Sequence, residues 1–296
     1  MTSEKSISVL IANYNWDVSA LIKELHKQLI ASKVTFEILC YDNSKGSSFE
    51  SSNEKLNALD FVTYRLEHHH IGRSQNRNKL AQDAKHDWFL FLDGDSAIPN
   101  SEFISNYLTT SKSPMVVCGG TAYAEKPLNE NQLLRWTYGK EREEIGSDER
   151  NEKANSGFSS FNFLIKREAF ELVGFNNELT QYGHEDTLFG QDLRKHHFNV
   201  LHINNPLVHL GLDDNQVFLE KTRDAIQNLK TLVDSKVLEN ESKLTSYYLR
   251  LSKTRTKKVI SALFKRNNNK WEKNLCGQAP NMRIFDLYRL GYLCSL

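Results

Sequence analysis

The apolar run WFLFL at residues 88–92 ends abruptly in Asp93, Gly94 and Asp95. Five consecutive bulky apolar residues are typical of a central strand in a parallel sheet, because helices cover both of its faces. The two carboxylates then lie at the carboxyl end of that strand, where open α/β sheets bind their ligands. Carboxylates there suit a hard divalent cation that bridges to substrate phosphates. An acidic turn that merely caps a buried strand fits the tripeptide equally well, so the rest of the chain has to decide.

Strands and helices are expected to alternate through the first hundred residues. Asp17 marks the start of a helix in which apolar residues recur at helical spacing. Such alternation favours right-handed βαβ units and a mostly parallel sheet flanked by helices, which is the α/β class. The expected strands are residues 7–11, 36–41, 61–64 and 88–92, and the expected helices are residues 21–29 and 74–84.

Polar loops follow three of these strands, at residues 13–15, 42–44 and 93–95. Because parallel strands share a direction, the loops after them meet on one edge of the sheet. The sequence therefore predicts a ligand site built from three loops at that edge.

The second half of the chain is less regular. Residues 125–153 are rich in charge and amide and are predicted to form a mobile loop or lid, and residues 155–162 mix small polar and aromatic side chains that suit a sugar site. The asparagine triplet at 267–269 is expected to be a loop, and the histidines at 68–70 a polar strand end rather than a metal tract. Helices are expected at residues 167–173, at 186–196 and over most of the chain from 216 on.

Composition excludes several classes. The 296 residues carry a net charge of +1 with 39% hydrophobic residues, which indicates a globular protein without an overall field for nucleic acid. Its four cysteines form no Cys-x-x-Cys pair, which favours reduced thiols. No stretch approaches the ~20 apolar residues of a membrane span, and the first residues lack a signal-peptide core. We therefore expect a cytoplasmic protein, soluble or peripheral at the inner face of the membrane.

Two further features suggest chemistry. Glu185 and Asp186 follow a glycine and open a predicted helix, whose dipole favours ionised carboxylates, so Asp186 is a candidate general base; ordinary helix capping is the alternative. His209 ends a short apolar strand. A histidine there is more often a core residue, but beside Asp95 it would complete a mixed carboxylate and imidazole site that suits manganese.

In order and spacing, these elements resemble family 2 glycosyltransferases of the GT-A fold, a Rossmann-like fold with a mixed, mostly parallel sheet. The resemblance lies in the three polar loops, in Gly72 with Arg77 and Asn78, and in YGHED at residues 182–186. The last stretch is similar to the Gly-x-Glu-Asp motif of β-1,4-galactosyltransferases, although His184 replaces a small residue. The resemblance to family 2 covers residues 6–212. We therefore expect a catalytic domain at residues 1–212 and a helical, basic extension at residues 213–296.

The resemblance implies a role for each matching position. Asp42 would contact the uracil, Arg77 the diphosphate, and Asp93 the ribose or donor sugar, while Asp95 and His209 would hold Mn²⁺ or Mg²⁺. Asp186 would be the catalytic base. Ala12, Asn13 and Tyr14 would line the nucleotide pocket, and Glu185, Asn155 and Trp136 would bind the acceptor.

The implied activity is inverting, metal-dependent transfer of a hexose or N-acetylhexosamine from a UDP-sugar to a glycan or lipid-linked oligosaccharide, in bacterial surface polysaccharide synthesis. The Glu185–Asp186 motif favours UDP-galactose or UDP-N-acetylgalactosamine. One alternative is a sugar nucleotidyltransferase, although the first loop lacks the Gly-rich, basic character expected there. Another is a non-catalytic nucleotide-sugar-binding protein.

The C-terminal region carries many Lys and Arg residues but no Asp or Glu from residue 243 to 270. Apolar residues recur among them at helical spacing, as in basic helices that lie on anionic membranes. A helix packed on the catalytic domain with a solvated basic face explains the pattern equally well. Both interpretations stay open at the level of sequence.

Overall fold

A computed structural model describes residues 6–67, 71–110, 114–178, 183–238, 242–254 and 256–296. Its strands are β1 (Ser6–Asn13), β2 (Thr35–Asp42), β3 (Val62–Leu66), β4 (Trp88–Asp93), β5 (Ser96–Ala97), β6 (Val116–Cys118), β7 (Thr121–Ala122), β8 (Asn162–Lys166), β9 (Val200–His202) and β10 (Leu207–His209). Its helices are α1 (Ser19–Ser32), α2 (Glu50–Glu54), α3 (Gly72–Asp83), α4 (Phe103–Thr109), α5 (Leu133–Arg142), α6 (Ser147–Asn151), α7 (Arg167–Val173), α8 (Glu185–Lys195), α9 (Asn215–Asp234), α10 (Lys243–Ser252), α11 (Thr256–Leu275) and α12 (Met282–Ser295). Two 3₁₀ turns span Lys55–Ala58 and Glu130–Gln132.

The central sheet has seven strands in the order β3-β2-β1-β4-β8-β6-β9. Only β8 runs antiparallel to its neighbours; the other pairs are parallel. A second, three-stranded sheet joins β5, β10 and β7 beside the carboxyl end of β4. The predicted α/β class with a mixed, mostly parallel sheet is confirmed.

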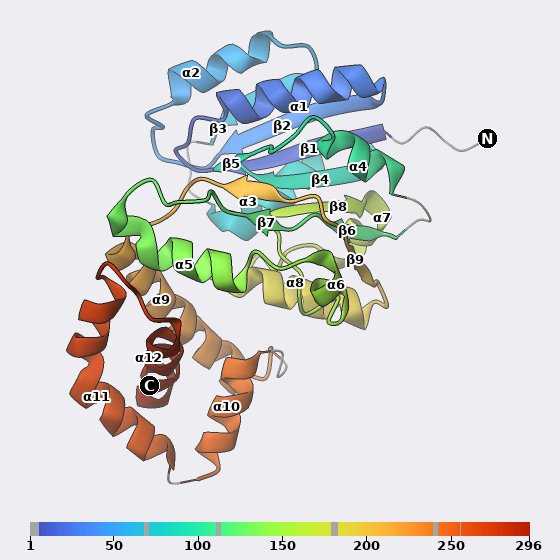
Figure 1. Ribbon diagram of the computed structural model, residues 1–296. Coiled ribbons are helices and arrows are strands. Elements are labelled where there is room, and N and C mark those ends of the chain that lie inside the picture. The colour runs from blue at the N-terminus through green and yellow to red at the C-terminus, as the bar shows by residue number, and fades with distance from the viewer. Residues whose placement is uncertain (1–5, 68–70, 111–113, 179–182, 239–241, 255) are drawn as a thin grey trace.

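Helices cover both faces of the central sheet, as the apolar run at residues 88–92 predicts (Figure 1). Alternate residues of β4 enter two separate cores: Leu90 and Leu92 pack with α1 and α4, whereas Phe89 and Phe91 pack with α3, α7 and α8. All four side chains are at most 1% exposed. A strand buried on both faces has no polar side, which explains why its sequence does not alternate.

Two predictions for the irregular regions are wrong. Residues 125–153 contain α5 and α6 in place of a loop, because Leu134 and Tyr138 of α5 bury themselves against α9 and α12. The asparagine triplet at 267–269 lies inside α11, where Phe264 and Trp271 on either side pack onto α12. Tertiary packing stabilises both helices against an unfavourable local composition. The histidines at 68–70 lie outside the described residues.

Helices α9 to α12 pack together below the sheet (Figure 1). One apolar cluster joins Leu188 of α8 to α9, α10 and α12, and another joins Leu134 of α5 to α9, α11 and α12. The helical C-terminal region that the sequence predicts is therefore tied to the sheet domain through α5 and α8. None of the helices in the described residues combines the length and the apolar character that crossing a membrane requires.

Candidate active site

The carboxyl ends of β1, β2 and β4 meet at one edge of the sheet. Asn13 at the end of β1 pairs with Asp42 of β2, and Ala12 pairs with Asp93 of β4. Because the strands are parallel and in register, the three polar loops leave the sheet side by side. The backbone NH of Gly94 donates to the carbonyl of Ala12 and closes the third loop onto the first (3.1 Å).

Asp42 holds two of these loops in place. Its carboxylate is fully buried and accepts hydrogen bonds from Asn13 Nδ2 (2.9 Å), the Asn15 backbone NH (3.1 Å), Ser44 Oγ (2.7 Å) and NH (3.1 Å), and Tyr64 Oη (3.2 Å). A carboxylate with this many donors is strongly held in one orientation. The structure therefore gives Asp42 an architectural role, and contact with a nucleobase stays a prediction.

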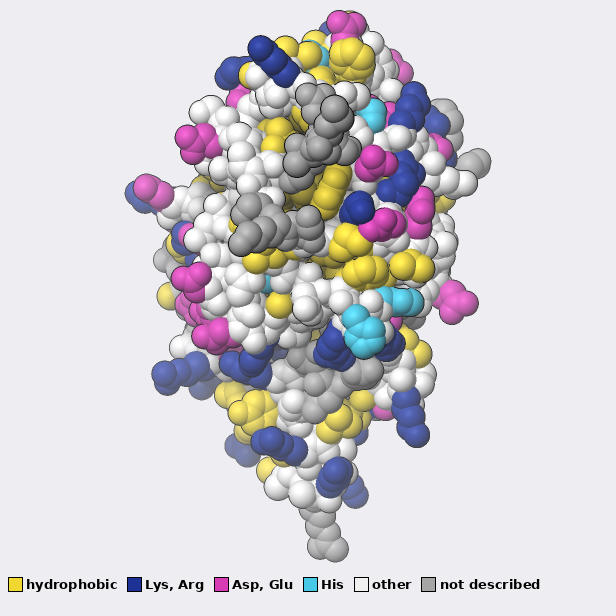
Figure 2. Space-filling model, turned by 90° about the vertical axis from the view of Figure 1, so that its right-hand side faces the viewer, with side chains coloured by type: hydrophobic (Ala, Val, Ile, Leu, Met, Phe, Trp, Pro, Cys, Tyr) yellow, Lys and Arg dark blue, Asp and Glu magenta, His cyan; other side chains and the backbone are white. Residues whose placement is uncertain are grey.

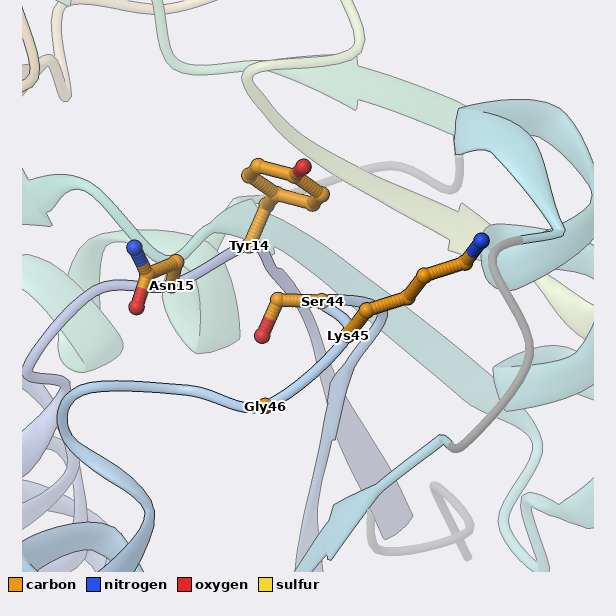
Figure 3. A pocket seen from close by; sticks show the side chains of 5 residues that line it. All are labelled: Tyr14, Asn15, Ser44, Lys45 and Gly46. Carbon is orange, nitrogen blue, oxygen red and sulfur yellow. The ribbon is translucent and has the colours of Figure 1, made fainter.

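A pocket of about 390 Å³ opens between the same loops (Figure 3). Tyr14 and Asn15 line it from the loop after β1, and Ser44, Lys45 and Gly46 from the loop after β2. Tyr14 is 64% exposed and brings an aromatic ring to this pocket. Of the three residues predicted to line a nucleotide pocket, Tyr14 lines this one, whereas Ala12 and the buried Asn13 are not part of its lining.

Arg77 reaches the edge from α3. Its Nη2 donates to Asp93 Oδ1 at 2.6 Å, and its side chain is only 3% exposed. Burial lowers the pKa of Arg77, but the charges of Asp93, Asp186 and Glu185 raise it more. The structure thus brings three predicted carboxylates together around the Arg77 guanidinium, whose Nη1 is buried with no hydrogen-bond partner.

Asp95 and His209 come together through the small sheet. The antiparallel pairing of His209 with Ser96 places His209 Nε2 3.4 Å from Asp95 Oδ2. Burial raises the pKa of Asp95, but the hydrogen bond with His209 and the charge of His209 lower this pKa by more. Gly211 is required here, because a Cβ at this position would lie 2.2 Å from Asp95 Oδ2.

This pair suits a divalent cation that is only partly held by protein. A carboxylate oxygen and an imidazole nitrogen side by side are ligands that Mn²⁺ accepts. The described residues contain no group of three or more His, Cys, Asp or Glu side chains that would make a complete metal cage. Two protein ligands leave positions for water and substrate phosphate, as is usual where a metal works on a nucleotide.

Asp186 lies in the first turn of α8. Gly183 and His184 precede it in the left-handed region, at φ of 89° and 71°, and turn the chain into the helix. Its Oδ2 accepts the backbone NH of Ser160 (3.1 Å), whereas its Oδ1 is buried with no partner. Burial and the charge of Glu185 raise the pKa of Asp186 to about 6. The sequence predicted that the helix dipole would keep this carboxylate ionised, but burial opposes that effect. At neutral pH the carboxylate is still mostly ionised.

Glu185 contacts Arg73, a residue that the sequence analysis missed. Arg73 Nη1 lies 3.8 Å from Glu185 Oε1, and the Arg73 side chain is 57% exposed. Burial raises the pKa of Asp93, and the charge of Arg73 opposes part of that rise; the same charge helps to lower the pKa of Asp95. The signal was available, because Arg73 stands directly after Gly72 in the motif that supplied Arg77.

The side chains of two predicted acceptor residues bond to backbone carbonyls. Asn155 donates to the carbonyl of Phe198 (2.7 Å), and its own carbonyl packs closely against Gly190 in the middle of α8. The indole NH of Trp136 in α5 donates to the carbonyl of Ala124 (2.9 Å). Tyr182 of the acceptor motif lies outside the described residues.

Known structures share this fold. The chain superposes with a TM-score of 0.52 on the mannosyltransferase PcManGT from Pyrobaculum calidifontis, whose structure contains GDP-Man and Mn²⁺, at 15% identity, covering 79% of this chain and 65% of that one. It thus spans slightly less than two thirds of that protein. The chain also superposes on residues 1–349 of TarS from S. aureus with a TM-score of 0.51 at 16% identity, covering 95% of this chain and 83% of that one. Both are GT-A glycosyltransferases.

At such low identity the neighbours establish the fold alone, and no curated protein sequence matches the chain. The family comes from the sequence itself. The model of glycosyl transferase family 2 matches residues 8–174, more than half of the chain, including the three polar loops and Arg77. The chain therefore belongs to glycosyl transferase family 2.

Proposed function

We propose that this glycosyltransferase moves a hexose or N-acetylhexosamine from a UDP-sugar to a hydroxyl of a glycan acceptor, with inversion of the anomeric centre. The observation that carries the proposal is the Asp186 carboxylate. Its Oδ1 is buried without a protein donor, close to the Arg77–Asp93 pair and on the edge that also holds Asp95 and His209. A buried carboxylate oxygen without a protein donor can accept the proton of an acceptor hydroxyl, as a general base must.

Asp186 would accept the acceptor's proton as the acceptor oxygen attacks the anomeric carbon. The bond from that carbon to the diphosphate breaks as the new glycosidic bond forms, and the nucleoside diphosphate leaves. Base and leaving group lie on opposite faces of the sugar, so a single displacement inverts the centre. Glu185, next to the base and paired with the exposed Arg73, would accept hydrogen bonds from acceptor hydroxyls.

The leaving diphosphate needs positive charge. The buried Nη1 of Arg77 has no partner, so it would donate to a phosphate oxygen while Nη2 stays on Asp93. When bound, Mn²⁺ or Mg²⁺ would stabilise the same charge, and Asp95 and His209 are the residues that would hold it. Lys45, which lines the pocket between the first two loops, is a further cation on the nucleotide side.

The nucleotide and the sugar are proposals with different support. The exposed Tyr14 ring and the polar pocket around it suit a nucleobase, but they do not by themselves separate uracil from guanine. The Glu185–Asp186 motif favours UDP-galactose or UDP-N-acetylgalactosamine. Because one structural neighbour is in complex with GDP-Man, GDP-mannose belongs in any donor panel.

The first test is release of nucleoside diphosphate from a panel of UDP-sugars and GDP-mannose, with Mn²⁺ and with a chelator. We expect release from one UDP-sugar that requires metal and is lost in Asp95→Ala. Metal-independent release would refute the proposed metal site. Release of pyrophosphate from a sugar phosphate and UTP would favour a sugar nucleotidyltransferase, and tight UDP-sugar binding without turnover when acceptor glycans are supplied would favour a binding protein.

We also propose a lipid-linked acceptor in bacterial surface polysaccharide synthesis, reached at an anionic membrane surface. Figure 2 shows Lys and Arg side chains mixed with apolar ones over the C-terminal helices at the bottom of the view. On α11, Val259 and Leu263 are 65% and 42% exposed, although both are apolar. Lys258, Lys265 and Arg266 are also exposed on α11, and apolar and basic side chains exposed on one helix suit anionic lipid.

Vesicle flotation tests this surface. We expect the protein to float with vesicles of phosphatidylglycerol and phosphatidylcholine at low salt but not with phosphatidylcholine alone. Replacing Lys258, Lys265 and Arg266 by Glu should abolish flotation. The matched control replaces the exposed Lys23, Lys126 and Lys153 by Glu, which changes net charge equally on other surfaces. Equal loss in both triple variants would show that only net charge matters and would refute the α11 surface.

A further inference from the structure

The two ring nitrogens of His209 face different surroundings. Nε2 faces Asp95, where the proposed cation would bind, at 3.4 Å from Oδ2. Nδ1 points the other way, toward Tyr123 Oη at 3.4 Å and Arg135 Nη2 at 3.3 Å. The orientation of the imidazole is therefore set by residues outside the edge where the donor would bind.

Tyr123, Arg135 and Glu143 form one cluster behind the imidazole, in which Tyr123 is buried and the Glu143 side chain is 33% exposed. The Tyr123 hydroxyl donates to Glu143 Oε2, and Arg135 Nη2 donates to the same oxygen at 2.9 Å. The Arg135 side chain is 11% exposed, and its guanidinium lies 5.3–5.9 Å from the ring centroids of Tyr123, Tyr138 and Phe218. Such packing on several sides fixes the carboxylate and the phenol relative to His209.

The two groups at Nδ1 favour opposite tautomers of a neutral imidazole. Arg135 can only donate, so its contact requires a bare Nδ1 and leaves the proton on Nε2, which then cannot bind a cation. The Tyr123 hydroxyl donates its hydrogen bond to Glu143, so its oxygen can accept a hydrogen bond from Nδ1–H. Only that second arrangement leaves the Nε2 lone pair free. Histidines that bind metals usually donate their other NH in this way.

We propose that Tyr123, backed by Glu143, is a positioning residue that holds the His209 proton on Nδ1 and so leaves Nε2 free to bind a divalent cation beside Asp95. Arg135 keeps Glu143 ionised and competes for Nδ1 when no cation is bound. The inference rests on the proposed metal site and deepens it. It assigns a role to a cluster that the sequence did not reveal, because Tyr123 after β7 and the two residues of α5 and its C-cap meet His209 only in the folded chain.

The chain offers a matched control far from this edge. In α12, the Tyr288 hydroxyl donates to Glu272 Oε1 (2.7 Å), and Arg223 of α9 donates to the same oxygen (3.1 Å). Tyr288 is fully buried, and this second cluster has the same three residue types, but no histidine is among its contacts in the described part of the chain. Removing its hydroxyl costs a buried hydrogen bond without affecting His209.

The experiment measures Mn²⁺ binding to the full chain, without nucleotide, by calorimetry or by the electron paramagnetic resonance signal of free Mn²⁺. For Tyr123→Phe we expect a dissociation constant raised about 10–100-fold, the usual effect of losing the partner of a metal-binding histidine. Tyr288→Phe should bind like wild type, and Asp95→Ala should not bind. Glu143→Gln is the second variant, should Tyr123→Phe fold poorly; it frees Arg135 for Nδ1 and should also weaken binding.

A spectroscopic readout separates positioning from simple packing. In ¹⁵N-labelled protein loaded with diamagnetic Mg²⁺, we expect the His209 proton on Nδ1 in wild type and in Tyr288→Phe, with a shift toward Nε2 in Tyr123→Phe. Unchanged Mn²⁺ affinity in Tyr123→Phe, with wild type binding normally, overturns this proposal and leaves the metal site intact. Failure of wild type to bind Mn²⁺ overturns both.

Discussion

The carboxyl edge of the sheet and the helical region α9–α12 differ in whether their buried polar atoms have hydrogen-bond partners. Among the described residues, six buried side-chain atoms have no hydrogen-bond partner, and all of them precede residue 213. Arg77 Nη1 and Asp186 Oδ1 lie in the candidate site, and Arg135 Nη1 lies behind His209. The full set is Asn13 Oδ1, Asn76 Oδ1, Arg77 Nη1, Gln132 Oε1, Arg135 Nη1 and Asp186 Oδ1.

In α9–α12 the same kinds of groups have partners. Glu272 accepts from both Tyr288 and Arg223, and the Asn228 amide donates to the carbonyl of Gly183 at 2.8 Å. An unpartnered buried polar atom costs about 1–3 kcal/mol, so a protein keeps one where a ligand will supply the missing bond. The comparison teaches that the edge is organised for ligands and the helical region for stability.

Asp186→Asn should break the site while sparing the fold, and it has the largest expected effect. Loss of a general base lowers turnover by about 10²–10⁴-fold, while UDP-sugar binding stays unchanged. Because burial raises the pKa of Asp186 to about 6, its ionised form is disfavoured in the folded protein, so Asn should raise the free energy of unfolding at pH 7 by about 1–3 kcal/mol. Turnover assays and urea denaturation measure the two effects; unchanged turnover would remove Asp186 from the mechanism.

Leu293→Ala should have the converse effect. Leu293 of α12 is 1% exposed in the cluster that joins α8, α9 and α10, so the cavity left by truncation should cost about 2–5 kcal/mol of unfolding free energy. Equilibrium denaturation measures this loss, and UDP affinity of the folded fraction should not change. A parallel fall in UDP affinity would show that the helical region shapes the site after all.

The pH profile sharpens the comparison within the site. With a pKa of about 6, Asp186 must lose its proton to act as base, so kcat/KM should fall about tenfold per pH unit below pH 6 and level off above it. For stability the sign is opposite: the raised pKa favours the protonated folded state, so this group's contribution is lost as pH rises from about 4 to 6. Rates in overlapping buffers provide the measurement; a flat profile from pH 5 to 7 contradicts the assignment.

Arg223→Met should have the smallest effect. The Arg223–Glu272 pair is about one quarter to one third exposed, and such pairs contribute about 1 kcal/mol or less. Thermal unfolding should therefore shift by a few degrees at most, and transfer should not change. Loss of transfer in this variant would mean that the helical region contributes directly to catalysis, against the division drawn above.

The sequence predicted the frame of the molecule because that frame depends on local patterns. The apolar run at residues 88–92 indicates a strand covered on both faces, and β4 is buried on both faces. The spacing of helix 167–173 also matches α7 to the residue. Prediction was weaker where local composition and tertiary packing favour different structures. In α5 the charged sequence indicates a loop, but Leu134 and Tyr138 pack against α9 and α12 and stabilise a helix.

By itself, the sequence determined the parallel sheet, the polar loops at its edge and the family, because these follow from periodicity and from motifs within short stretches of chain. Only the tertiary structure decided that Asp42 is saturated by protein donors, that the Asn155 amide bonds to the carbonyl of Phe198, and that Tyr123 and Arg135 meet behind His209. The physical reason is that hydrogen bonding, burial and pKa depend on groups brought together from distant segments. Such groups leave no periodic trace in the sequence.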